Sequence, residues 1–215
     1  MTASDLRRAE AHLAAVDDDW AGLVRQVGPC DLVVVRGREP YEALVRSVAY
    51  QQLHTRAGDT ILGRMLQLYP EARFPTPEAL LATDVATLRA CGYSARKVET
   101  MHGIAAAAID GVVPTRRQAA RMHSERLIER LVTLRGVGRW TVEMCLIFTL
   151  GRPDVLPLDD FGVRDGYRRL KGLPALPAPK ELALAGESWA PWRSVAAWYL
   201  WRLPRGTADV GEAGG

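Results

Sequence analysis

The chain has 215 residues, of which 48% are hydrophobic and 25% are charged, and its formal net charge at pH 7 is +3. This is ordinary globular usage with enough length for a sizeable core, and it excludes disordered, fibrous and collagen-like chains. No apolar run approaches the length of about 18 residues that a membrane span needs, and the polar start of the chain has no secretory leader. We therefore predict no membrane partner and a cytoplasmic location.

The cysteines set a second limit. Cys30, Cys91 and Cys145 are far apart and odd in number, which is typical of buried thiols in a reducing compartment. Three scattered thiols cannot supply the four thiolates of an iron–sulfur cluster, so we predict that the chain carries none.

Apolar residues recur at helical spacing through most of the chain. In chain order, this periodicity predicts helices over residues 6–16, 41–68, 77–91, 95–109, 124–134, 139–150, 161–170, 180–185 and 191–203. Proline and glycine separate these runs, and Pro204 ends the last one. Residues 32–36 alone read as β, and they are too few to organise a sheet. The predicted fold class is all-α.

Two polar residues are predicted to cap helices. Ser124 precedes the helix that runs to residue 134, and Asp160 directly precedes the helix that begins at residue 161. After the last helix, residues 205–215 are rich in Gly, Asp and Glu, so we predict a flexible tail there.

A glycine hairpin is the most informative local pattern. Gly136, Val137 and Gly138 lie between two predicted helices, and the second helix opens with Arg139, Trp140 and Thr141. Glycine lets a ligand approach the backbone closely, and the N–H groups at a helix start favour an anion such as a phosphate. A plain turn between two helices would also explain the pattern, because Gly-x-Gly is widespread.

The hairpin, followed by Asp159 and Asp160 at the next helix start, resembles the helix-hairpin-helix DNA glycosylases, in particular the DNA-3-methyladenine glycosylase II type. The resemblance covers about residues 41–203 and implies one glycosylase unit over 1–204, in the short form without an N-terminal β domain. It implies two helical lobes with a cleft between them, one over about 41–151 and the other combining 1–40 with 158–204.

The resemblance gives the hairpin a role in holding the DNA backbone. Gly136, Val137, Gly138, Arg139 and Thr141 would bind phosphate, with Val137 anchoring the hairpin in the core. The backbone carbonyls of Val132, Leu134 and Val137 could hold a structural Na⁺ or K⁺ ion, and no other cofactor is implied.

The resemblance also assigns the chemistry. Asp160 would stabilise the sugar cation that forms as the base leaves and would position water, because a carboxylate favours developing positive charge. Asp159 is the alternative, although a capping role suits it better. Trp140 stands where bifunctional relatives have a nucleophilic lysine, and an indole cannot form a Schiff base. This predicts a monofunctional enzyme without lyase activity.

Aromatic residues would hold the flipped base. By resemblance, Trp140, Phe161 and Trp201 line the base pocket, and Met144 stands where the family has a tyrosine. Alkylated purines carry positive charge, which the face of an indole attracts. The alternative is a place in the hydrophobic core, which suits Trp192 and Trp198 better.

A loop near residue 52 matches the family's wedge, which fills the gap that the flipped nucleotide leaves. Gln52 would be inserted, Leu53 is the neighbouring alternative, and Gln51 would brace the site; an ordinary helix end would also explain the pattern. Several further residues are candidate phosphate contacts or simply solvated side chains: His54, Lys97 and Arg164. Glu143 could enter the base pocket, although a place on a solvated helix face suits it better.

Together these features predict a monofunctional DNA glycosylase that removes alkylated bases, such as 3-methyladenine and 7-methylguanine, in base excision repair. Its partner would be double-stranded DNA with a damaged base. We expect a monomer that associates with DNA in a cytoplasm of the bacterial type. Two alternatives stay open: a glycosylase for another lesion class, and a helix-hairpin-helix DNA-binding module without catalysis.

Overall fold

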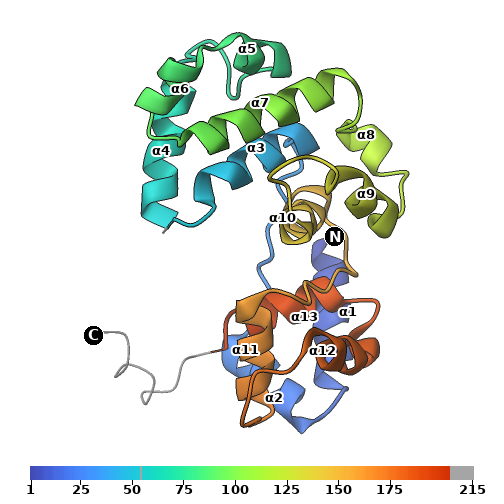
Figure 1. The fold of residues 1–215 in the computed structure, drawn as a ribbon. Coiled ribbons are helices and arrows are strands. Elements are labelled where there is room, and N and C mark those ends of the chain that lie inside the picture. Colours follow the sequence, from blue (N-terminus) through green and yellow to red (C-terminus); the bar gives the residue numbers. More distant parts are fainter. Residues whose placement is uncertain (54, 204–215) are drawn as a thin grey trace, which may run out of the picture. The chain divides into compact units, whose positions relative to one another are not determined.

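The computed structural model describes residues 1–53 and 55–203, so the predicted tail at 205–215, His54 and Pro204 lie outside the described residues. Helices make up the regular structure of this part of the chain, and no strand occurs in it (Figure 1). The all-α prediction is therefore confirmed. Among the described residues, none of the helices combines the length and the apolar character that crossing a membrane requires.

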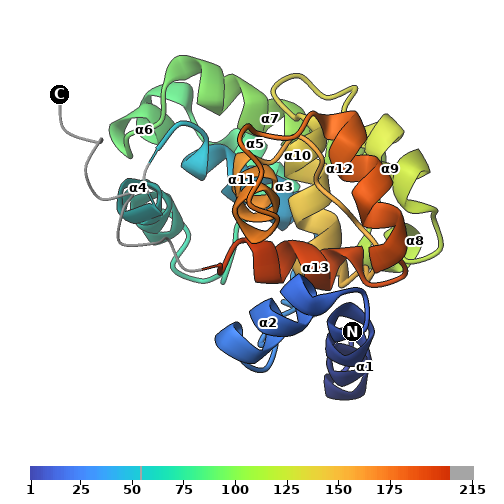
Figure 2. The same ribbon diagram turned by 90° about the horizontal axis from the view of Figure 1, so that it is seen from below.

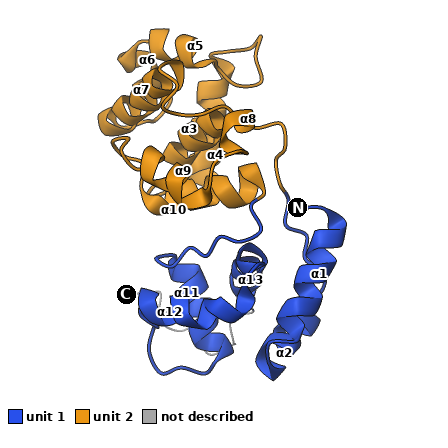
Figure 3. Cartoon of the chain, turned by 90° about the vertical axis from the view of Figure 1, so that its right-hand side faces the viewer, with its two compact units in different colours: residues 1–33, 152–215 blue, residues 34–151 orange. Residues whose placement is uncertain are grey.

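The chain forms two compact units, which Figure 3 shows in different colours. Unit 1 combines Met1–Val33 with the chain from Arg152 onward, and unit 2 is the continuous segment Val34–Gly151. The helices of unit 1 are α1 (Ala3–Ala14), α2 (Asp18–Val27), α11 (Phe161–Leu170), α12 (Pro179–Ala185), the 3₁₀ helix η2 (Gly186–Trp189) and α13 (Arg193–Leu200). The helices of unit 2 are α3 (Pro40–Tyr50), α4 (Thr55–Gln67), α5 (Pro77–Ala82), α6 (Val85–Ala90), α7 (Ala95–Ile109), α8 (Arg116–Ala119), α9 (Ser124–Leu131), α10 (Arg139–Met144) and the π-helix η1 (Cys145–Leu150).

In unit 2, α7 is the helix against which α3, α5 and α6 pack (Figures 1 and 2). The apolar faces of these helices and of α4 form the core of the unit, with fully buried side chains at Leu44, Met65, Leu80, Leu88, Met101 and Ile104. The two ends of the unit meet where the amide of Val35 donates to the carbonyl of Phe148 at 2.8 Å. This bond is isolated, so the prediction of β structure at 32–36 is wrong.

In unit 1, α13 is the central helix, and its residues Ser194–Leu200 are all buried. It packs against α1, α2 and α11, which come from both ends of the chain. The rings of Trp20 and Trp189 lie edge to face at 5.1 Å, and the hydroxyl of Tyr199 donates to the carbonyl of Gly28 at 2.9 Å. This aromatic core holds the N-terminal helices against the C-terminal ones.

Several helix boundaries differ from the predicted ones, and at one of them a side-chain cap starts a new helix inside an apolar run. The run over 77–91 breaks where Asp84 accepts the amide N–H of Thr87 at 3.0 Å and begins α6. The run over 41–68 breaks into α3 and α4, and α2 was not predicted. Ser124 is the first helical residue of α9 rather than its cap; His123 holds that position without a side-chain hydrogen bond.

Candidate active site

In unit 1, Asp160 caps α11, as predicted. Its Oδ1 accepts the amide N–H of Val163 at 2.8 Å and the indole N–H of Trp201 at 2.8 Å. Trp201 follows the last residue of α13, so the packing of α11 on α13 brings the two side chains together. The positive end of a helix favours an ionised carboxylate at this position. The result is a carboxylate held in one orientation by two donors.

Gly162 makes this arrangement possible, and the sequence reading missed it. A Cβ atom built at Gly162 would lie 2.8 Å from Cδ1 of Trp201 and 3.2 Å from Oδ1 of Asp160. Any other residue would displace the indole from the carboxylate. The signal was available, because a glycine in the first turn of an otherwise good helix usually marks close packing.

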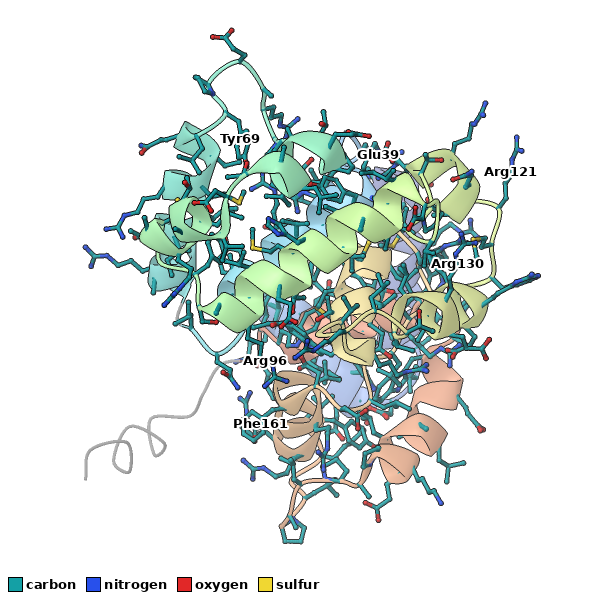
Figure 4. All side chains as sticks on the ribbon, turned by 45° about the horizontal axis from the view of Figure 1, so that its top comes forward. Glu39, Tyr69, Arg96, Arg121, Arg130 and Phe161 are labelled. Atoms are coloured by element: carbon teal, nitrogen blue, oxygen red, sulfur yellow. The ribbon has the colours of Figure 1, made fainter. Side chains whose placement is uncertain are left out.

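Both chain neighbours of Asp160 are exposed. Asp159 is exposed, and 66% of the surface of Phe161 is accessible. Figure 4 labels Phe161, the first residue of α11. An aromatic side chain at this exposure does not belong to the hydrophobic core, so Phe161 is available to a ligand.

In unit 2, the two glycines of the hairpin have different surroundings. Gly136 has a φ of +81°, and a Cβ atom there would lie 2.5 Å from Oγ1 of Thr100. Gly138 has an ordinary extended conformation, and a Cβ atom there would meet no atom within 4 Å. The fold therefore requires glycine at 136, whereas the open space at 138 is left on the surface of the hairpin. Val137 is buried between them.

The loop after α3 lies beside this hairpin. A cavity of about 510 Å³ is lined by residues from α3, α7 and the hairpin: Tyr50, Gln51, Gln52, Ser94, Arg96, Lys97, Thr100, Gly136 and Trp140. Gln51 donates from Nε2 to the carbonyl of Gly136 at 3.0 Å, and Gln52 has a φ of +58°. Leu53 is exposed. Unit 2 thus brings Gln51, Gln52, the hairpin and Trp140 around one cavity.

Met144 faces a different cavity. Trp140 is 45% exposed and lines the first cavity. Met144 lines a separate cavity of about 230 Å³, which Arg46, Tyr50 and Cys145 also line. Thr141, between them on α10, is buried.

Two of the predicted phosphate contacts use their charged groups inside the protein. Lys97 donates from Nζ to the carbonyls of Gln51 at 2.9 Å and Ala49 at 3.3 Å, and burial lowers the pKa of its ammonium. Arg164 donates from Nε to the carbonyl of Pro177 at 2.9 Å.

Arg139 joins the two helices of the hairpin. Its guanidinium contacts Glu125 of α9 at 2.6 Å and Glu143 of α10 at 2.9 Å, and the hydrogen bond to Glu125 raises its pKa. Glu143 is only 3% exposed, so the prediction that it lies on a solvated face is wrong. The reason is the arginine at i−4, whose charge compensates a carboxylate that would otherwise be costly to bury.

The side chains that most often bind metal ions do not cluster in the described part of the chain. Cys30, Cys91 and Cys145 are all buried thiols. Over residues 1–53 and 55–203, no group of three or more His, Cys, Asp or Glu side chains could hold a metal ion.

Comparison with known proteins identifies the family of this chain. The family model described as "HhH-GPD superfamily base excision DNA repair protein" matches residues 45–191. The chain belongs to this superfamily. It is 46% identical to DNA-3-methyladenine glycosylase 1 of Schizosaccharomyces pombe, covering 94% of this chain and 89% of that protein. It is 38% identical to the alkylbase DNA glycosidase-like protein mag2 of the same organism, covering 94% and 95%.

Solved structures of relatives have the same fold. The S. pombe 3-methyladenine DNA glycosylase in complex with abasic DNA matches with a TM-score of 0.83 and 46% identity, over 91% of this chain and 95% of that one. The DNA-3-methyladenine glycosidase of Bacillus halodurans matches with a TM-score of 0.79 and 31% identity, over 90% and 88%.

Proposed function

We propose that this protein is a monofunctional DNA glycosylase that removes 3-methyladenine, 7-methylguanine and related alkylated bases from double-stranded DNA in base excision repair. The observation that carries the proposal is the Asp160 carboxylate, which is fixed by the Val163 amide and the Trp201 indole. The names of the similar proteins support the same reaction. The protein would act as a monomer that associates with DNA.

Asp160 would act on the sugar. As the bond between the anomeric carbon and the base breaks, its electron pair leaves with the base and neutralises the charge of an alkylated purine. The sugar becomes an oxocarbenium ion, which an oriented carboxylate stabilises. Water then adds to the anomeric carbon and loses a proton, leaving an abasic site. Because an alkylated base is already cationic, it leaves readily and the site needs no strong acid or cofactor.

Trp140 makes the reaction monofunctional in this proposal. A lyase needs an amine that attacks the sugar and forms a Schiff base, and an indole has no such amine. Trp140, Phe161 and Trp201 would each contact the extrahelical base, whereas Met144 lines a separate cavity. Each contact between an indole face and a cationic base would contribute about 0.5–2 kcal/mol. The exposure of Trp140 and Phe161 supports this role.

The hairpin would hold the DNA backbone through Gly136, Val137, Gly138, Arg139 and Thr141. Gln52, or its neighbour Leu53, would fill the gap in the duplex, and Gln51 would brace the site. The open space at Gly138 supports a phosphate contact. The backbone carbonyl oxygens of Val132, Leu134 and Val137 would be the ligands of an alkali cation, which prefers oxygen ligands of this type. The carbonyl of Leu134 accepts the amide N–H of Val137 at 3.0 Å, and the second lone pair of this oxygen would contact the ion.

The proposal is tested by base release from methylated duplex DNA, with wild type beside Asp160→Asn and abasic sites read with and without alkali. We expect release by wild type only, with strand breaks only after alkali. Breaks without alkali would overturn the monofunctional assignment. If no base is released while DNA binding is intact, the protein acts on another lesion or serves as a binding module.

A further inference from the structure

The end of α3 is held by a lysine from another helix. The last carbonyls of a helix have no partners within it, and they carry partial negative charge. The last turn of α3 contains no basic residue. Instead, Lys97 of α7 donates from Nζ to the carbonyls of Ala49 at 3.3 Å and Gln51 at 2.9 Å. These contacts supply the cation that the end of α3 lacks.

The position of Lys97 on its own helix strengthens this interpretation. It lies in the first turn of α7, where the helix dipole disfavours a cation. Its ammonium is also partly buried, which lowers its pKa. Both effects oppose a lysine at this position, and the contacts with the end of α3 offset them.

Gln51 is held at two points. Its carbonyl accepts the ammonium of Lys97, and its side chain donates to the carbonyl of Gly136 in the hairpin at 3.0 Å. The next residue, Gln52, has a φ of +58°, a conformation that residues other than glycine rarely adopt and that persists only where the surroundings enforce it. Residues 51–53 are therefore kept in a strained shape by contacts from α7 and the hairpin.

We propose that Lys97 is a positioning residue, which together with Gln51 clamps the loop 51–53 to the hairpin and keeps Gln52 and Leu53 ready to enter the duplex. Lys97 does not contact DNA phosphate in this proposal. The inference rests on the proposed function, because only an enzyme that opens the duplex needs such a loop.

The neighbouring residue, Arg96, offers a matched comparison. It is exposed and lines the same cavity as Lys97 (Figure 4). Arg96→Met and Lys97→Met each remove one cation from the same helical turn, so net charge changes equally. Only Lys97→Met removes the contacts to the end of α3. Lys180→Met, an exposed change on α12 of unit 1, controls for the loss of one positive charge outside unit 2.

The experiment measures three quantities for each variant. The first is the dissociation constant for a duplex with a stable abasic-site analogue, as a function of salt concentration. The second is the fluorescence of 2-aminopurine placed beside that analogue, which reports insertion of the loop. The third is the single-turnover rate of base release from a duplex with one 7-methylguanine. Lys97→Arg, which can still donate to both carbonyls, serves as the conservative variant.

For Lys97→Met we expect a rate that falls by about tenfold, which corresponds to about 1.4 kcal/mol of barrier. The fluorescence change should be lost and the salt slope should equal that of wild type, while Lys97→Arg restores both rate and fluorescence. Arg96→Met should instead flatten the salt slope by about 0.9 if it contacts one phosphate. The Gln51→Ala variant, which removes only the contact to Gly136, should reproduce the loss of fluorescence even if Lys97→Met does not fold.

Two results would overturn the proposal. A salt slope that flattens in Lys97→Met would make Lys97 a phosphate contact. A wild-type fluorescence change in both Lys97→Met and Gln51→Ala would show that the loop is held without the clamp. If wild type releases no base at all, the proposed function fails, whereas the fluorescence and salt measurements on the abasic duplex still decide the role of Lys97.

Discussion

Unit 1 and unit 2 hold their functional groups by different means. In unit 1, Asp160 is fixed by the start of its own helix, through the Val163 amide three residues away, and by one indole from α13. In unit 2, the loop 51–53 depends on Lys97 and Gly136, which lie 46 and 85 positions further along the chain. A helix start orients a carboxylate with little help, whereas an exposed loop needs distant tethers to keep one shape.

The difference separates two kinds of damage. A change at Asp160 should remove the chemistry and leave the fold and the DNA contacts intact. A change at the hairpin or the loop should alter how unit 2 is held together as well as how it binds. The following predictions test that separation, beginning with the largest effect.

Asp160→Asn should lower the single-turnover rate of base release by about 10²–10³. Asparagine keeps an oxygen that can accept both N–H bonds, so the cap and the thermal stability should be retained while the charge is lost. The rate and the affinity for an abasic duplex are measured side by side, with the exposed neighbour as the control in Asp159→Asn. Equal rates for Asp160→Asn and wild type would remove Asp160 from the chemistry.

Gly136→Ala should destabilise the protein by about 1–3 kcal/mol, because the residue has a positive φ and its new methyl group would meet Thr100. Gly138→Ala has an ordinary backbone conformation and open space, so its stability should match wild type while its affinity for DNA falls. Denaturant unfolding and DNA titration measure the two effects. Normal DNA binding by Gly138→Ala would mean that the open face at 138 is not used.

Trp201→Phe should lower the rate of base release by about tenfold, because the ring is kept while a hydrogen bond to a charged group is lost. Trp198→Phe is the matched control on α13. Trp198 is buried, and its Nε1 has no hydrogen-bond partner among the described residues. The Trp198→Phe variant should lose stability through poorer packing and keep the wild-type rate of base release per folded molecule. A similar rate loss in both variants would argue against a specific role for the Trp201 N–H.

The smallest effect concerns acid stability in unit 1. Burial tends to raise the pKa of Asp165, but hydrogen bonds from Arg168 and Arg169 outweigh it and lower the pKa below the ordinary 3.8. The ionised Asp165 carboxylate therefore adds to the free energy of unfolding at pH values above 3.8. This stabilisation is lost as the pH falls through the lowered pKa of the folded state. Asp165→Asn should lower the melting temperature by about 2–4 °C at neutral pH. The difference from wild type should shrink as the pH falls below 3.8, and a constant difference would contradict the ion-pair account.

Local signals explain what could be predicted. The helical class follows from apolar periodicity, and the cap at Asp160 follows from a carboxylate placed directly before such a run. The tight turn at Gly136 likewise follows from neighbouring residues, because Gly136 and Gly138 lie between two helical runs. Prediction failed in two places. Asp84 starts α6 inside an apolar run that had predicted one continuous helix. Residues 32–36 have a β-type composition, but they have no partner strand.

Contacts between distant residues explain what could not be predicted. The sequence by itself determined the helices, the hairpin and the carboxylate at a helix start, because each depends on residues within a few positions of one another. Only the tertiary structure decided that Trp201 meets Asp160, that Arg139 compensates the buried Glu143, and that Lys97 holds the end of α3. An exposed lysine and a lysine that caps another helix look the same in sequence, because the carbonyls that distinguish them belong to a distant segment and are brought near only by packing.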